Sequence, residues 1–257
     1  MDAIERCFYV AGLDCKVLDA PLGRGDERIF QLDIQRAHKG QRYGVWKGDG
    51  ANRAEVVGLD RQLRQLVLFV EEPQRSFEQV IRVHNRQDRQ RRVEAAWQAG
   101  GRVVREDERQ LVVELQTRSA KRHLLLGMDE SHLFIAQLPR PVSSVHQAHQ
   151  VLCPEVVAGR RDVIRQGEWF FVPANAREQV LVSQGRIDRN RDLGSAGRPH
   201  LCDEVVRWVE GKEQLLFARG RVRHVEHRTL ELRQWMRVHK NTEIRNDFRD
   251  LGISWID

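Results

Sequence analysis

The sequence predicts a β-rich α+β fold in which mostly short antiparallel strands form two packed subdomains with two helices. Short apolar segments alternate with polar turns along most of the 257 residues. Helical periodicity is clear in only two places. Hydrophobic residues make up 40% of the chain and charged residues 31%, which is typical of a folded protein. The chain is therefore long enough for one large domain or two small ones.

Three successive hairpins are predicted in the first half, after early strands at Ile29–Ile34 and Tyr43–Trp46. Each hairpin pairs two apolar segments across a short polar link, and the pairs are Ala54–Leu59 with Leu66–Val70, Arg102–Arg105 with Leu111–Leu115, and Leu124–Gly127 with Leu133–Leu138. Consecutive hairpins of this kind predict a meander or a small barrel.

The first predicted helix begins after Asp88 as its N-cap and ends at Gly100. Val93, Ala96 and Trp97 recur at the spacing of one helical face. Arginines at 89, 91 and 92 would then occupy its first turns, where positive charge opposes the helix dipole. An anion bound at this end would relieve the conflict and would also use the free N–H groups.

The second predicted helix follows Pro139-Arg-Pro141. Ser144 and Gln147 fit a capping box, an apolar face follows, and Pro154 stops the helix. We take this segment as the boundary between two units. The predicted organisation is an N-terminal β-rich domain over 1–140, a linking helix over 141–154 and a C-terminal β-rich domain over 155–257.

A basic hairpin is predicted within the stretch from Arg219 to Trp235. Placing the apolar side chains of both strands on one face sets Val222 opposite Leu230 and Arg221 opposite Glu231. This register also sets Arg223 opposite Thr229. It implies a loop with an odd number of residues, either 225–227 or 224–228. His224 and His227 then lie at or beside the tip.

The charge distribution favours a nucleic-acid-associated protein as the leading function. The formal net charge is +6, with 43 basic and 37 acidic residues. Arginine pairs with phosphate in a bidentate geometry, and two separate segments are rich in it. The residues expected to bind the phosphate backbone of DNA or RNA are Arg86, Arg89, Arg91, Arg92, Arg219, Arg221, Arg223 and Arg228.

Two alternatives stay open. The first is a phosphodiesterase or nuclease that uses His224 and His227 as catalytic residues, with arginines stabilising the charge of the transition state. The second is a structural or scaffold protein whose basic surface binds an acidic protein partner. The sequence lacks the Walker A, G-x-G-x-x-G, H-E-x-x-H and G-x-S-x-G motifs, which argues against the enzyme classes that use them.

A metal site needs at least a third ligand beside His224 and His227. His200 and Cys202 could join them, and His239 is another candidate, but the separation exceeds that of ordinary zinc fingers. We therefore expect no metal and no cofactor.

The four cysteines are widely spaced and form no C-x-x-C pair, which is typical of reduced thiols in a cytoplasm. No secretory signal pattern and no apolar run of membrane-spanning length is apparent. The sequence predicts a soluble cytoplasmic protein with no membrane contact.

Overall fold

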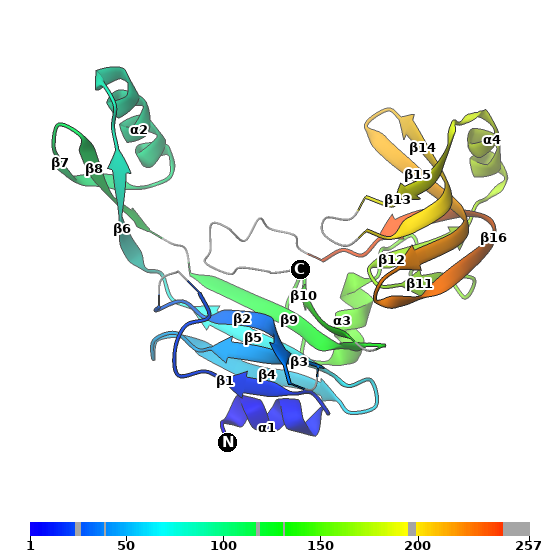
Figure 1. Cartoon of the computed structure of the whole chain (residues 1–257), viewed down its shortest axis with the longest axis horizontal. Coiled ribbons are helices and arrows are strands. Elements are labelled where there is room, and N and C mark those ends of the chain that lie inside the picture. The colour runs from blue at the N-terminus through cyan, green and yellow to red at the C-terminus, as the bar shows by residue number, and fades with distance from the viewer. Residues whose placement is uncertain (24–26, 39, 117–118, 131, 195–198, 244–257) are drawn as a thin grey trace.

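The computed structural model describes residues 1–23, 27–38, 40–116, 119–130, 132–194 and 199–243. Figure 1 shows their strands arranged in separate sheets, with helices packed against them. The fold is β-rich α+β, as predicted.

Two sheets face each other in the first half of the chain. One has the order β1-β3-β2 and the other β10-β9-β5-β4. Their strands are β1 (Cys15–Val17), β2 (Gln31–Ala37), β3 (Gly40–Trp46), β4 (Arg53–Asp60), β5 (Gln65–Glu72), β9 (Ala120–Asp129) and β10 (His132–Gln137). Phe8, Leu32, Tyr43, Leu68 and Leu126 belong to the core that joins these sheets.

Two helices pack against this pair of sheets. The helix α1 (Ala3–Val10) contributes Ile4 and Phe8 to the core between them. The helix α3 (Val145–Leu152) packs on the opposite face of the four-stranded sheet, against Val67 and Leu125. The central parts of β5 and β9 are therefore buried on both faces, which explains the apolar runs Leu66–Val70 and Leu124–Leu126.

An insertion lobe interrupts the four-stranded sheet between β5 and β9. We use this name for β6 (Ser76–Arg82), α2 (Arg86–Gln98), β7 (Arg102–Glu106) and β8 (Gln110–Gln116). Its sheet has the order β6-β8-β7, and α2 packs on it through Val83, Ala96 and Leu111. Figure 1 shows the lobe standing apart from the other sheets at one end of the molecule.

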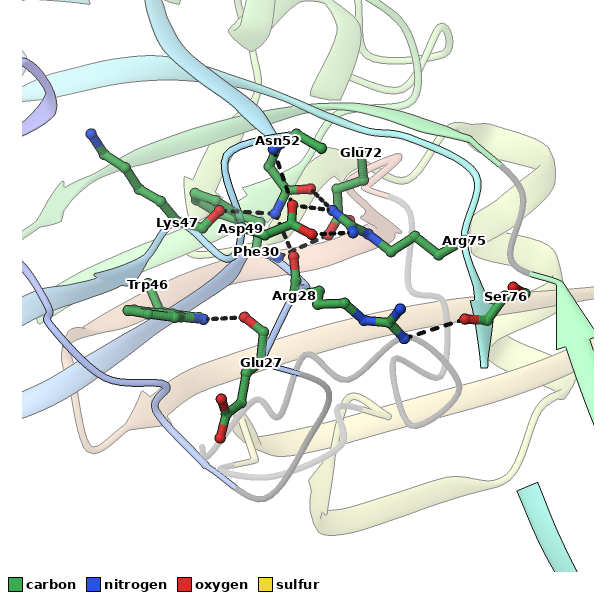
Figure 2. Close-up of polar contacts among 11 residues, drawn as sticks. Glu27, Arg28, Phe30, Trp46, Lys47, Asp49, Asn52, Glu72, Arg75 and Ser76 are labelled. Atoms are coloured by element: carbon green, nitrogen blue, oxygen red, sulfur yellow. Dashed lines mark hydrogen bonds and ion pairs between the residues drawn. The ribbon is translucent and has the colours of Figure 1, made fainter. Parts of the chain in front are cut away.

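An arginine clamp holds the start of the insertion lobe. The guanidinium of Arg75 donates to both carboxylate oxygens of Asp49 at 2.5 and 2.6 Å and to the amide oxygen of Asn52 at 2.7 Å. Figure 2 shows these three side chains meeting beside Arg28, whose guanidinium donates to the carbonyl of Ser76 at 3.3 Å. The hydrogen bonds from Arg75 lower the pKa of Asp49, so the carboxylate stays charged.

The second half forms one antiparallel six-stranded sheet with the order β11-β12-β16-β15-β14-β13. Its strands are β11 (Ile164–Gln166), β12 (Trp169–Pro173), β13 (Ile187–Asp192), β14 (Leu201–Glu210), β15 (Glu213–His224) and β16 (His227–Lys240). Phe171, Ala218 and Met236 lie in the core on one face. The helix α4 (Ala176–Gln184) places Val182 against Phe217 on the other face.

The three predicted hairpins are present as β4–β5, β7–β8 and β9–β10. They do not join into one meander or one closed sheet within the described residues, because β7–β8 belongs to the insertion lobe. The described residues hold α1 and α4 in addition to the two predicted helices. Both extra helices begin with a capping box, Asp2 with Glu5 and Asn175 with Glu178.

The second predicted helix is confirmed, with Ser144 as its N-cap, but the predicted start of the first is wrong by three residues. Asn85 caps α2 through a bond from the Asp88 N–H, and the carboxylate of Asp88 accepts the N–H of His84. Among the described residues, no helix has the length and apolar character needed to cross a membrane.

Candidate metal centre

The hairpin of β15 and β16 has the predicted register from Gly220 to Val222, and a register shift between Ala218 and Gly220 changes the pairing farther from the tip. Arg221 lies opposite Glu231 and Val222 opposite Leu230. The predicted odd loop is wrong, because His224 pairs with His227 across a two-residue turn. A bulge between these pairs sets Arg228 and Thr229 together opposite Arg223, and this absorbs the extra residue. His224 and His227 thus flank the turn at the hairpin tip, as predicted.

A third histidine joins them from the neighbouring strand. His200 directly precedes β14, and its carbonyl accepts the N–H of Leu193 at 3.0 Å. Because β14 pairs with β15 so that Leu201 lies opposite Arg223, His200 reaches the level of the hairpin tip. We call His200, His224 and His227 the histidine cluster.

The three rings of the histidine cluster are stacked. The ring centroids of His200 and His224 lie 4.1 Å apart with an interplanar angle of 12°. The centroid of His227 lies 5.4 Å from that of His200 and 4.8 Å from that of His224. One ring nitrogen from each residue lies within 4.8 Å of the other two. Three imidazoles therefore offer their nitrogens to one small volume.

His200 is the buried member of the cluster, with 2% of its surface exposed. Within the described part of the chain, neither of its ring nitrogens has a hydrogen-bond partner. Burial lowers the pKa of His200, Glu168 opposes this shift, and His224 and His227 add to it, so that the resulting pKa is about 4. The ring is therefore neutral at pH 7, the protonation state that binds metals. A buried polar group without a partner costs about 1–3 kcal/mol, so a ligand at this ring would remove a penalty.

Gly167 leaves space beside the cluster. Its backbone has φ +56°, and a Cβ at this position would lie 3.0 Å from Nε2 of His227 and 3.4 Å from Nε2 of His200. The two Nε2 atoms therefore converge on the volume that a larger residue would fill. Glycine suits this position for two reasons: it tolerates a positive φ, and it has no side chain to block the nitrogens.

His224 takes part in the hairpin turn as well. Its Nδ1 accepts the N–H of Glu226 at 3.2 Å, which places the proton of the neutral ring on Nε2. Coordination through Nε2 would require this proton to move to Nδ1 or leave, and coordination through Nδ1 would replace the bond from Glu226.

A polar pocket of about 350 Å³ adjoins the cluster, and we call it the junction pocket. It lies where the β9–β10 turn meets β11 and the start of β16. His227 and Gly167 line both the pocket and the space beside the Nε2 atoms. The junction is held by Gln166, whose side chain donates to the carbonyl of Arg228 at 2.6 Å, and by Glu130, whose carboxylate accepts the N–H of Arg228 at 3.1 Å.

The arginines predicted on the first helix are mostly engaged in ion pairs. Arg91 and Arg92 contact the carboxylate of Asp88 at 2.9 and 3.0 Å, and Arg89 contacts Glu106 at 3.0 Å. Asp88 thus supplies negative charge in the first turn of α2, the role that we expected of a bound anion. Arg86 is exposed at the first residue of the helix.

The arginines predicted on the hairpin divide into two groups. Arg219 pairs with Glu204 at 2.6 Å, and Arg221 and Arg223 both pair with Asp203, at 3.1 and 2.7 Å. Arg228 instead lines the junction pocket. Figure 1 shows α2 at the opposite end of the molecule from β14, so the two arginine clusters lie on separate parts of the fold. Nucleic-acid binding through them stays a prediction.

Sequence reasoning considered His200 beside His224 and His227, together with Cys202 and His239, and favoured no metal. Neither Cys202 nor His239 belongs to the cluster among the described residues. Cys202 is buried, and its thiol donates to the carbonyls of Glu204 and Arg219. Gly167 and Arg165 carry no pattern that identifies them in the sequence, because Gly167 meets the histidines only in the folded chain and Arg165 contacts its carbonyl.

Comparisons of the chain with protein-family models, with curated proteins and with solved structures found no match.

Proposed function

We propose that this chain binds a divalent transition metal ion, with zinc as the reference ion, through His200, His224 and His227. The observation that carries the proposal is the convergence of Nε2 of His200 and of His227 on the space beside Gly167, with the third imidazole stacked against them. Zinc in catalytic centres has three protein ligands and one open position. An open position here would face the junction pocket, because His227 and Gly167 line both.

The three histidine nitrogens would have to move closer together to hold a metal ion. Nitrogens about 2.0–2.1 Å from a tetrahedral zinc lie about 3.3 Å apart. The candidate nitrogens lie within 4.8 Å of one another, so binding would draw the rings together and turn them out of their stack. The half-buried His224 and His227 flank a two-residue turn, which gives them room for this adjustment.

Nucleic-acid binding and binding of an acidic protein partner have less support. The arginines expected to bind nucleic acid are mostly paired with carboxylates, which reduces the charge they present. An acidic protein partner would meet the same paired arginines. A cytoplasmic location fits a metalloprotein whose four cysteines are all free thiols.

Metal titration of the full chain tests the proposal. Chelator-treated protein should bind one zinc ion with a Kd below about 1 μM by competition with a chromophoric chelator. Cobalt in its place should give the intense visible absorption of a tetrahedral complex. His227→Gln and His224→Gln should each weaken zinc binding at least about 100-fold, because ligand loss exceeds the effect of outer-shell changes.

Two further variants complete the experiment. His146→Gln changes an exposed histidine on α3 and should leave zinc binding unchanged. Gly167→Ala keeps all three ligands but fills the space beside their nitrogens, so it should weaken binding while circular dichroism shows a folded protein. Absence of stoichiometric zinc, or zinc binding that survives every histidine cluster variant, would contradict the proposal.

A further inference from the structure

The junction pocket contains two guanidinium groups, those of Arg165 and Arg228. Arg165 and Arg228 both line it, and among the described residues neither forms an ion pair with a carboxylate. This distinguishes them from Arg219, Arg221 and Arg223, which are paired. Two free guanidiniums in one pocket are a recognition device for phosphate or carboxylate groups.

Arg165 is held in place for such a role. Its Nε donates to the carbonyl of Gly167 at 2.9 Å, and its guanidinium lies 5.5 Å above the ring of Phe170. Its Nη1 also lies 3.5 Å from Nδ1 of His149, whose Nε2 contacts the side chain of Gln65 at 2.6 Å. Since Gly167 adjoins the histidine nitrogens, this arginine is anchored next to the proposed metal.

The pocket also holds two carboxylates, which limit the positive charge that its ligand meets. Asp129 and Glu130 line it together with Arg165 and Arg228, so the four charges cancel in the absence of metal. A divalent ion would leave a net charge of +2, which suits an anionic phosphate group. The volume of about 350 Å³ is that of a small-molecule site.

Resting on the proposed metal centre, we propose that the junction pocket binds a phosphodiester and that the protein hydrolyses it. A metal ion held by the histidine cluster would lower the pKa of a water bound to it, and Asp129 would accept the proton of that water. The oxygen of this water would form a bond to phosphorus while the bond from phosphorus to the leaving oxygen breaks. The leaving oxygen would take the proton from Asp129, so the products are a phosphate monoester and an alcohol. Arg165 and Arg228 bind the non-bridging oxygens as charge develops on them.

Glu130 has a different role from Asp129. Its carboxylate accepts the backbone N–H of Arg228 and thereby fixes the position of this arginine at the pocket wall. Glu130 is therefore a positioning residue, whereas Asp129 is the proton acceptor. Thr229 adds a hydroxyl donor to the same wall.

The experiment uses zinc-loaded full chain with bis(p-nitrophenyl) phosphate as the diester. We expect zinc-dependent release of p-nitrophenol. Arg165→Gln and Arg228→Gln should each lower kcat/KM at least about tenfold, the effect of losing one charge-assisted hydrogen bond. Zinc affinity, measured separately, should stay within about twofold, because neither side chain is a ligand. Arg233→Gln changes an exposed arginine of β16 outside the pocket and should leave turnover unchanged.

Substrate comparison tests recognition of the phosphate group. The neutral ester p-nitrophenyl acetate should react more slowly than the diester, because it lacks the charged non-bridging oxygens that Arg165 and Arg228 bind. A protein that binds zinc stoichiometrically but does not cleave the diester would overturn this inference and leave the metal centre standing. A protein that binds no zinc would contradict the proposed function instead. Equal cleavage of the diester and the acetate, or full activity in both pocket-arginine variants, would also overturn the inference.

Discussion

The hydroxyl of Tyr43 is bound to the backbone of Gly127 on the facing sheet. It accepts the N–H of Gly127 at 2.9 Å and lies 2.7 Å from the carbonyl of the same residue. The carbonyl of Phe134, opposite Gly127 in β10, lies 2.8 Å from the hydroxyl and competes for its one proton. Tyr43 is fully buried, and burial raises its pKa. This polar contact therefore joins β3 to β9 inside an apolar core.

Replacing Tyr43 with phenylalanine should destabilise the protein by about 1–3 kcal/mol, because it leaves the buried N–H of Gly127 without this partner. The ring itself is retained, so its edge contact with Phe8 remains. Urea denaturation at neutral pH measures the change. Tyr9→Phe is the matched control, since Tyr9 is 74% exposed and should change stability by less than about 0.5 kcal/mol. Equal stability of the two variants would contradict the assigned role.

His239 should make stability fall in mild acid. Burial, together with the nearby positive charges of Arg237 and Arg160, lowers its pKa to about 4. The native state therefore binds fewer protons than the unfolded state, whose histidine titrates near pH 6.5. The stabilising contribution is complete above pH 6.5 and is lost as pH falls from 6.5 to 4.

The variant His239→Gln should consequently lose less stability than the wild type between pH 6.5 and 4. Urea midpoints measured across this range give the difference directly, and carboxylates common to both proteins cancel. The exposed His38→Gln is the control and should follow the wild-type curve. Parallel curves for wild type and His239→Gln would contradict this prediction, because they would show that His239 has the same pKa in the folded and unfolded states.

Asp203 should restrain nucleic-acid binding by the hairpin. Its carboxylate accepts the N–H and Nε of Arg221 at 3.0 and 3.1 Å and contacts Arg223 at 2.7 Å. Hydrogen bonds from Arg221 and Arg223 lower its pKa to about 2, so it stays charged. Asp203→Asn should therefore raise the affinity for single-stranded DNA at about 50 mM salt. The slope of log binding constant against log salt concentration should also become steeper, by up to the amount expected for about one more phosphate contact.

Glu210→Gln provides the control for net charge alone, since Glu210 pairs with Arg177 and not with the hairpin arginines. It should leave DNA affinity near the wild-type value. Undetectable binding of DNA and RNA by both wild type and Asp203→Asn would exclude the predicted nucleic-acid function.

Local patterns predict much of this fold. Ser144 and Gln147 mark the start of α3, and alternating apolar residues place Val222 opposite Leu230. Both depend on residues near one another in the sequence. Asp88 misleads for a local reason: Asn85, three residues earlier, has an equally suitable side chain and caps the helix instead. The bulge at Arg228 and Thr229 alters the predicted loop, and a second register shift between Ala218 and Gly220 alters the pairing farther along the strands.

The candidate site depends on contacts that local patterns do not reveal. His200 meets His224 because β14 pairs with β15, and a register shift beyond Cys202 adjusts this pairing. Gly167 lies beside His227 although β12 pairs with the other end of β16, where Trp169 is opposite Lys240. Spacing along the chain counted against a metal site, whereas the sheet brings the three imidazoles together.

The two ends of the insertion lobe leave and re-enter one sheet at adjacent positions, because Glu72 of β5 lies opposite Ala120 of β9. A short turn would connect these two residues as well as the lobe does. The lobe has its own apolar core. Apart from the pairing of β5 with β9, which flank the lobe, the contacts of Arg75 hold it to the rest of the chain. It is therefore a removable module: a shortened chain would keep both facing sheets, the six-stranded sheet and every residue of the histidine cluster.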